Sequence, residues 1–373
     1  SLARQNRFPD AIDTWRKGIE AYQAPEDMDT VARLYARSAW AARQANAPDE
    51  QLDFCLEWLA RTGKAQDGPG LALLLHETAR AYADHASLAD AEPYARRALE
   101  VAERLDDAHL RAHTLAALSA PVAGSLEERA AVATRAVELA EAHGLLLAAQ
   151  HAHRDLAAYR SSQGDYASAR EHCLRGAELA RQAGSASAQS RILAFLVHLA
   201  VYFGELGEAG TALSEAQLLV QDLPGPTRAR VRILLGELWY LAHLGKWDTC
   251  LQEARSAQAS LRERGAERDL AEALLTLGLA IVESRQIGQA PHPGEWQEAE
   301  TALSEAAEIF DRSSSPQWGT YARILLGNLY LGLGRTADAQ RMLAEAREGD
   351  RRYPLFWLVG PRQWLQGQLA ASR

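Results

Sequence analysis

Residues 319–352 read GTYARILLGNLYLGLGRTADAQRMLAEAREGDRR, and they decide the fold because they contain one complete pair of amphipathic helices. Gly327 lies inside the first predicted helix, where the absent side chain lets the backbone of the partner helix come close, and Tyr330 fills the hollow beside it. Gly334 allows the turn between the two helices. The second helix presents a narrow apolar stripe with spacings of four and three: Ala339, Leu343 and Ala346.

The same second-helix pattern recurs along the whole chain, which indicates a repeat array. The first 22 residues already look like a second helix that starts at Phe8, without its first helix. Because that helix and an initiator Met are missing, we expect the chain to be excised from a longer protein. The later second helices are predicted, at intervals of about 41 residues on average, to start at Leu52, Leu88, Leu126, Tyr166, Ala209, Trp247, Trp296 and Thr336.

These repeated positions resemble the tetratricopeptide (TPR) repeat, a pair of helices stacked on its neighbours. The resemblance implies an all-α fold, a right-handed α-solenoid (superhelix) of about eight TPR-like hairpins plus terminal half-repeats. We expect residues 1–373 to form a single repeat domain, with residues 353–373 as a terminal capping helix or half-repeat.

Three segments depart from the regular pattern. Pro93 lies near the start of a second helix, and Pro121 should shorten the preceding helix and make residues 119–125 irregular. Residues 284–296, SRQIGQAPHPGEW, predict an extended connection inside a hairpin. That connection is either a solvated surface loop or a contact loop for a partner.

Composition excludes several classes of protein. The net charge of −9 argues against direct nucleic-acid binding, and no apolar run approaches the length of a membrane-spanning helix. Cys55, Cys173 and Cys250 are far apart, which predicts buried packing residues in a reducing cytoplasm and no disulfide or zinc framework.

No stretch of the sequence carries a recognisable catalytic or nucleotide-binding motif. We therefore expect no enzyme activity, no cofactor and no metal. His109 and His113 are four residues apart, and His151 and His153 are two apart, but neither pair has a third ligand at suitable spacing. These histidines are expected to be structural or solvated.

The TPR resemblance also implies a binding surface, because in such arrays the first helices line a concave groove. Arginine occurs in five of the repeats at the ligand-facing positions, and such a row could clamp carboxylates, phosphates or an acidic peptide. The alternative is that arginine is simply abundant on helix surfaces. The ligand-facing positions hold Arg33, Trp40, His76, Arg80, Arg111, Thr114, His151, Arg154, Arg230, Glu237, Tyr240, Glu272, Tyr321 and Asn328.

Phrases such as AVELAEAHG (136–144) and AAEIF (306–310) are similar to the sensor arrays of bacterial signal-transduction ATPases and of MalT-like LuxR-type transcriptional activators. This resemblance implies a cytoplasmic, non-catalytic interaction or sensor module in signalling or transcription regulation. Its partner would be a protein or peptide, acidic or carboxylate-bearing, with self-association through the terminal helices as a further possibility. The alternative is a small-molecule inducer sensor, as in MalT-like activators.

Overall fold

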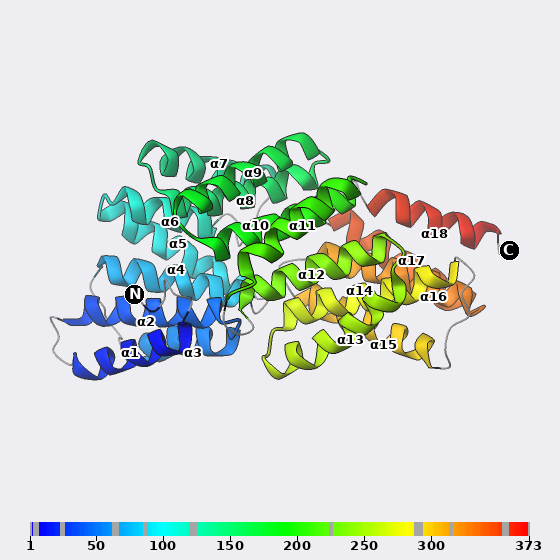
Figure 1. Ribbon diagram of the computed structural model, residues 1–373, viewed down its shortest axis with the longest axis horizontal. Helices are drawn as coiled ribbons and strands as arrows, with labels where there is room; N and C mark the ends of the chain where they lie inside the picture. The colour runs from blue at the N-terminus through cyan, green and yellow to red at the C-terminus, as the bar shows by residue number, and fades with distance from the viewer. Residues whose placement is uncertain are drawn as a thin grey trace. The chain divides into compact units, whose positions relative to one another are not determined.

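The described part of the chain folds almost entirely into helices (Figure 1). The computed structural model describes residues 2, 7–22, 27–61, 67–84, 88–118, 126–223, 227–286, 294–312, 316–352 and 358–371. Within these ranges the chain forms 18 helices and no strand. The predicted all-α fold is confirmed.

Helices α2 to α17 form eight consecutive pairs, with α1 (Phe8–Ala21) and α18 (Val359–Ala371) at the ends. The first helices of the pairs are α2 (Met28–Gln44), α4 (Pro69–Asp84), α6 (Ala108–Leu118), α8 (Leu146–Ser162), α10 (Ala186–Tyr202), α12 (Arg228–His243), α14 (Glu267–Gln286) and α16 (Pro316–Gly332). The second helices are α3 (Pro48–Arg61), α5 (Leu88–Arg104), α7 (Leu126–Ala142), α9 (Tyr166–Gln182), α11 (Leu206–Val220), α13 (Trp247–Glu263), α15 (Glu295–Arg312) and α17 (Thr336–Arg352).

The predicted starts of the second helices agree with the structure to within a turn. Five are correct to the residue: Leu88, Leu126, Tyr166, Trp247 and Thr336. The other three helices begin one to four residues before the predicted Leu52, Ala209 and Trp296. These helices start earlier because Pro48 is favoured in a first helical turn and because turn glycines precede α11 and α15.

The central helices follow a regular half-repeat that explains the long spacing of the sequence pattern. They begin at Leu126, Leu146, Tyr166, Ala186 and Leu206, each 20 residues after the previous one. A glycine with positive φ lies in each intervening turn, at positions 144, 164, 184 and 204. The extra length relative to the shortest TPR form therefore resides in helices of 15 to 17 residues.

The turn after α16 shows how the chain reverses. Gly334 has φ +72°, a conformation that residues with a side chain rarely adopt. The Arg335 amide donates to the Tyr330 carbonyl at 2.8 Å, and the Gly334 amide donates to the Leu331 carbonyl at 2.9 Å. These bonds satisfy carbonyls at the end of α16, so the predicted role of Gly334 is confirmed.

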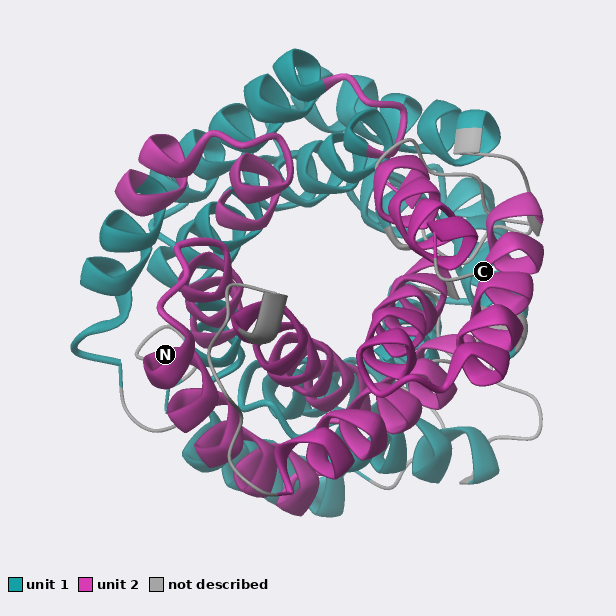
Figure 2. Ribbon diagram, turned by 90° about the vertical axis from the view of Figure 1, so that its right-hand side faces the viewer, with its two compact units in different colours: residues 1–161, 166–196, 212–233 teal, residues 162–165, 197–211, 234–373 magenta. Residues whose placement is uncertain are grey.

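The chain divides into two compact units (Figure 2). Unit 1 comprises residues 1–161, 166–196 and 212–233, and unit 2 comprises residues 162–165, 197–211 and 234–373. Within unit 1, α4 packs against α2, α5 and α6; within unit 2, α16 packs against α14, α15, α17 and α18. First helices thus contact first helices of neighbouring pairs, as stacked hairpins require. The single repeat domain stays a prediction.

Gly327 has a different partner from the predicted one. A Cβ added at Gly327 would lie 2.5 Å from Leu365 Cδ2, so the glycine makes room for a side chain of α18. Leu365 and Leu369 are buried, whereas Trp364 is 44% exposed. Tyr330 instead hydrogen-bonds Glu300 at 2.9 Å. Phe356 and Trp357, which were expected in the same terminal helix, lie outside the described residues.

The other predicted irregularities are only partly within the described residues. Pro93 is the sixth residue of α5, inside the helix. Helix α6 ends at Leu118 after 11 residues, so it is short, as Pro121 predicts, while residues 119–125 lie outside the described ranges. Most of the predicted connection 284–296 also lies outside them.

The three cysteines are free and buried, in agreement with the predicted packing role. Burial raises the pKa of Cys55 and of Cys250 to about 12. No described helix combines the length and the apolar character needed to cross a lipid bilayer.

Candidate binding site

Unit 1 contains a set of buried and half-buried arginines that come from five first helices. We call Arg43 (α2), Arg80 (α4), Arg154 (α8), Arg191 (α10) and Arg228 (α12) the arginine cluster. Its members lie near enough to one another for their charges to interact, since, after burial, Arg228, Arg43, Arg154 and Arg80 all lower the pKa of Arg191. Sequence separation is large, but the stacking of first helices brings these side chains together.

Asp84, the last residue of α4, joins two members of the arginine cluster. Arg43 Nε donates to Asp84 Oδ2 at 2.6 Å, and the two terminal nitrogens of Arg228 donate to Asp84 Oδ2 and Oδ1, each at 2.9 Å. Burial raises the pKa of Asp84, but Arg228 and Arg43 outweigh it and hold that pKa well below its usual value. Both oxygens of the Asp84 carboxylate are therefore already engaged in ion pairs within the protein.

Helix α4 supplies further charges on the same face. Glu77, Arg80 and Asp84 are spaced by three and four residues, which places them on one side of the helix. Burial and the neighbouring Arg228 lower the pKa of Arg43 to about 9, and burial raises the pKa of Glu77. Arg154 Nε donates to Asp155 at 2.9 Å. Glu77, Asp84 and Asp155 are thus acidic neighbours of the arginine cluster.

Two arginines of the cluster keep unused donors. The structure gives Arg191 no hydrogen bond and no ion pair with any described residue, and burial followed by Arg228 lowers the pKa of Arg191 strongly. Arg80 Nε is buried without a hydrogen-bond partner among the described residues. Because arginine stays protonated at neutral pH, Arg191 is a positive charge without an ion pair among the described residues, and Arg80 has one donor left unused. A ligand with anionic oxygens would satisfy them.

Three histidines lie against the arginine cluster: His76 (α4), His113 (α6) and His151 (α8). The rings of His76 and His113 are 6.0 Å apart, nearly perpendicular. Burial, followed by neighbouring positive or histidine groups, lowers the pKa of all three, that of His113 to about 4. At neutral pH these imidazoles are uncharged.

No family model and no curated protein matches this sequence. Among solved structures, the chain is similar to a Rap protein complexed with Competence and Sporulation Factor, at 14% identity and a TM-score of 0.58, covering 89% of this chain and 99% of that chain. The apo form of RapI aligns at 12% identity and a TM-score of 0.53, covering 95% and 99%.

A third structure is a signal-transduction ATPase (STAND) protein with a tetratricopeptide repeat sensor from Pyrococcus horikoshii, at 12% identity and a TM-score of 0.51, covering 100% of this chain and 55% of that protein. The chain has the TPR fold. At these identities the similarity shows the fold alone, so the site must be argued from the residues themselves.

The TPR array brings together four of the residues predicted to face a ligand. His76, Arg80, His151 and Arg154 all lie at the arginine cluster. Other predicted residues of unit 1 lie elsewhere or are already engaged. Their contacts are as follows: Arg33 pairs with Asp29 at 2.8 Å, Trp40 packs on Phe8, Arg111 pairs with Asp106 at 3.3 Å, Thr114 bonds its own helix, and Arg230 binds the carbonyls of Gln221 and Leu223.

The predicted residues of unit 2 do not form one site of this kind. Tyr321 belongs to an aromatic group with Tyr202, Trp239 and Trp318, in which the rings in contact have centroids 5.3–6.5 Å apart. The hydroxyl of Tyr240 lies over Gly210, and Asn328 Oδ1 is buried without a partner among the described residues. Glu272 lies 4.0 Å from Arg268, and Glu237 is half-buried on α12.

Sequence reasoning missed Arg43, Arg191 and Arg228 as site residues. For Arg191 a signal existed, because it lies two half-repeats after His151 and therefore takes the same place on the next first helix. The convergence of Arg43 and Arg228 on Asp84 had no such signal, since it depends on helices far apart in the sequence.

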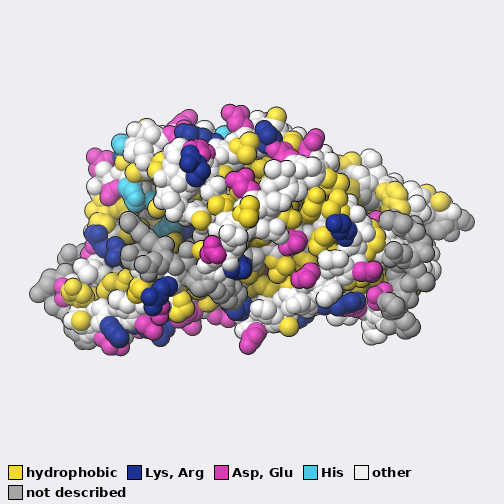
Figure 3. Space-filling view, viewed as in Figure 1, with side chains coloured by type: hydrophobic (Ala, Val, Ile, Leu, Met, Phe, Trp, Pro, Cys, Tyr) yellow, Lys and Arg dark blue, Asp and Glu magenta, His cyan; other side chains and the backbone are white. Residues whose placement is uncertain are grey.

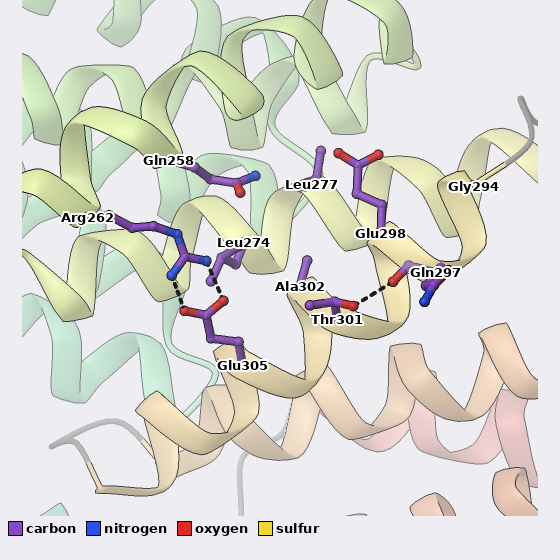
Figure 4. A pocket seen from close by; sticks show the side chains of 10 residues that line it. All are labelled: Gln258, Arg262, Leu274, Leu277, Gly294, Gln297, Glu298, Thr301, Ala302 and Glu305. Atoms are coloured by element: carbon purple, nitrogen blue, oxygen red, sulfur yellow. Dashed lines mark hydrogen bonds and ion pairs between the residues drawn. The ribbon is translucent and has the colours of Figure 1, made fainter.

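A cavity of about 350 Å³ in unit 2 offers a second candidate, which Figure 4 shows from close by. Its polar walls come from α13 and α15, above Leu274 and Leu277 of α14. Arg262 forms a two-pronged ion pair with Glu305, with one bond of 2.6 Å, and Thr301 donates to the Gln297 carbonyl at 2.8 Å. The charges that line this cavity are already paired, Arg262 with Glu305 and Glu298 with Arg255 of α13, so the cavity gives no reason to expect a charged ligand.

Proposed function

We propose that this chain is a non-catalytic interaction or sensor module that binds an acidic segment of a protein or peptide partner at the arginine cluster. The observation that carries the proposal is Arg191, a half-buried guanidinium without a partner among the described residues and with four other arginines beside it. An unpaired charge in such surroundings costs folding free energy. Ligand carboxylates would offset that cost.

The charge balance of the whole molecule supports an acidic ligand at this place. The chain carries a net charge of −9, and Figure 3 shows acidic and basic side chains interspersed over the visible face. The excess of positive charge in the arginine cluster is therefore local. Guanidinium groups bind carboxylates through paired, charge-assisted hydrogen bonds, so several arginines with free donors select for acidic side chains.

The fold is compatible with this role. The similar Rap structure is complexed with Competence and Sporulation Factor, which shows that a protein of this fold can hold a bound factor. First helices of five different hairpins supply the five arginines of the cluster, so a ligand there would touch several repeats at once. The alternative of a small-molecule inducer stays a prediction.

The test is fluorescence anisotropy with a labelled glutamate-rich peptide and the variant Arg191→Gln. We expect the variant to weaken binding by about tenfold, the effect of losing one charge-assisted contact. Its unfolding midpoint should hold or rise, because the substitution removes repulsion among arginines. The matched control is Arg181→Gln, which alters an exposed surface arginine of α9 paired with Glu178, and it should leave binding unchanged.

Two results would overturn the proposal. One is equal binding of a lysine-rich peptide of the same length, since that would show that charge does not select the ligand. The other is glutamate-peptide binding that Arg191→Gln leaves at the wild-type strength.

A further inference from the structure

We propose that His153 of α8 and His172 of α9 form a contact that tolerates one positive charge but not two, so that acid opens it. We call these two residues the histidine pair; both belong to unit 1 and to the same helical hairpin. The pair is an acid-sensitive switch built into the fold. It needs no ligand and therefore goes beyond the proposed function.

The two rings of the histidine pair meet through the same type of nitrogen. His153 Nδ1 lies 2.9 Å from His172 Nδ1, and the ring centroids are 5.1 Å apart. Gly176, one turn after His172 on α9, allows this approach, since a Cβ added there would lie 3.4 Å from His153 Cβ. A hydrogen bond between two imidazole nitrogens needs a single hydrogen, because one nitrogen donates and the other accepts.

Glu141 of α7 fixes the proton on the other side of His153. His153 Nε2 lies 3.3 Å from Glu141 Oε1, and Arg175 of α9 donates to the same oxygen at 3.0 and 3.1 Å. Burial raises the pKa of Glu141, but hydrogen bonds from Arg175 and His153 outweigh it and hold that pKa below its usual value. Glu141 therefore accepts, and His153 Nε2 carries a hydrogen. In the neutral pair, His153 Nδ1 is then the acceptor and His172 Nδ1 the donor.

The histidine pair accepts a first added proton and excludes a second. With one added proton, one ring becomes an imidazolium, and its Nδ1–H donates to the bare Nδ1 of the other ring. With two, both Nδ1 atoms carry a hydrogen, and two positive rings face each other across 2.9 Å. The contact must then open. The pair therefore titrates as a unit and not as two independent histidines.

The charged groups of the neighbouring helices do not remove this conflict. Burial has the largest effect on the pKa of His153, which is 5% exposed, and lowers it. Glu141 and Glu171 raise that pKa, whereas Arg175 lowers it, and the result stays below the ordinary value. One carboxylate, shared with an arginine, thus contacts the pair directly, and it can balance one positive charge.

The titratable neighbours of His153 along α8 point elsewhere. His151 and Asp155 lie two positions before and after it, and residues two apart on a helix do not face each other. Asp155 also accepts a hydrogen bond from Arg154 at 2.9 Å. The Asp155 carboxylate is therefore not the counter-charge of the histidine pair.

Linkage gives the sign of the effect. In the unfolded chain both histidines take up protons below their ordinary pKa of about 6.5, whereas the closed pair takes up at most one. The open state therefore binds more protons as the pH falls, and the hairpin opens more often. For one excluded proton, the opening equilibrium rises by at most about tenfold for each pH unit of acidification. Well above pH 6.5 both rings are neutral, and this pH dependence disappears.

Amide hydrogen exchange of the full chain, measured by mass spectrometry at about pH 7.5 and about pH 5.5, tests the switch. Each rate is divided by the intrinsic rate at the same pH. The variant His172→Gln keeps a donor and an acceptor but cannot be protonated. We expect acid to reduce the protection of α8 and α9 in the wild type, and to reduce it about tenfold less in His172→Gln. The control His143→Gln changes an exposed histidine and should match the wild type.

A second measurement uses the wild-type chain alone. Ring ¹⁵N NMR at neutral pH should show one protonated and one bare Nδ1, coupled across the shared hydrogen. Two protonated or two bare Nδ1 atoms in His153 and His172 would overturn the inference, and this result decides if His172→Gln does not fold. A loss of protection in acid that is as large in His172→Gln as in the wild type would also overturn it. Neither result depends on whether an acidic peptide binds the arginine cluster.

Discussion

At the scale of single residues, the arginine cluster is organised by one carboxylate. Asp84 has a side-chain exposure of 10%, and its two arginine partners, Arg43 and Arg228, have exposures of 7% and 17%. The sequence suggested arginines at ligand-facing positions, and Arg80 and Arg154 do lie in the cluster. It did not suggest Asp84, because an acidic residue at the end of a helix reveals nothing about a partner 144 residues away.

The substitution Asp84→Asn tests this organisation. It removes the charge of the carboxylate that Arg43 and Arg228 share, and removing one partner of a buried ion pair costs about 3–5 kcal/mol. We expect the free energy of unfolding, measured by urea denaturation, to fall by about that amount.

The matched control for Asp84→Asn is Glu178→Gln, which breaks an ion pair with Arg181 on the surface of α9. Because both side chains are well exposed, we expect no measurable change in the denaturation midpoint. A denaturation curve of Asp84→Asn that superimposes on the control would show that the buried ion pairs contribute nothing to stability.

At the scale of helices, the sequence was a good guide to where elements begin and a poorer guide to what they touch. Turn glycines and the apolar period mark helix ends locally, which is why Tyr166 and Trp247 were predicted as helix starts and observed as such. The partner of Gly327 was predicted wrongly. A small residue shows that something approaches closely, but only the tertiary structure shows that Leu365 of α18 does so.

Gly327→Ala should loosen the contact between α16 and α18. The new Cβ would lie 2.5 Å from Leu365 Cδ2, too close for both side chains to keep their positions. We expect thermal unfolding at a lower temperature, by an amount that corresponds to about 1–3 kcal/mol of overpacking. In a protein that already carries Leu365→Ala, the change Gly327→Ala should lower the stability less than it does in the wild type. A double-mutant cycle would measure this difference.

Gly367→Ala on α18 is the control, because an added Cβ there meets no atom within 4 Å. This change should be neutral or stabilising by up to about 1 kcal/mol, since alanine favours helix over glycine. Equal stability of Gly327→Ala and Gly367→Ala would contradict a close approach of α18 to α16.

At the scale of the whole molecule, the sequence predicted the repeat architecture but only part of the arginine cluster. Hairpins are local, so a period in the sequence predicts them. The arginine cluster arises only when α2, α4, α8, α10 and α12 are stacked, and no period encodes that convergence. A chain built by stacking should also distribute its stability along its length, because each hairpin is stabilised mainly by its neighbours.

The variant Leu303→Ala examines this distribution of stability. Leu303 is fully buried on α15, and its Cγ would lie 2.3 Å from a Cβ added at Gly278 of α14, so the two helices pack tightly there. Truncation should cost about 2–5 kcal/mol and should speed amide hydrogen exchange in α14, α15 and α16. Exchange in α2 to α5 should keep its wild-type rates, because in a stacked array the effect declines with each interface. If mass spectrometry instead showed equal loss of protection in both sets of helices, the chain would unfold as one cooperative body, and nearest-neighbour stacking could not be the source of its stability.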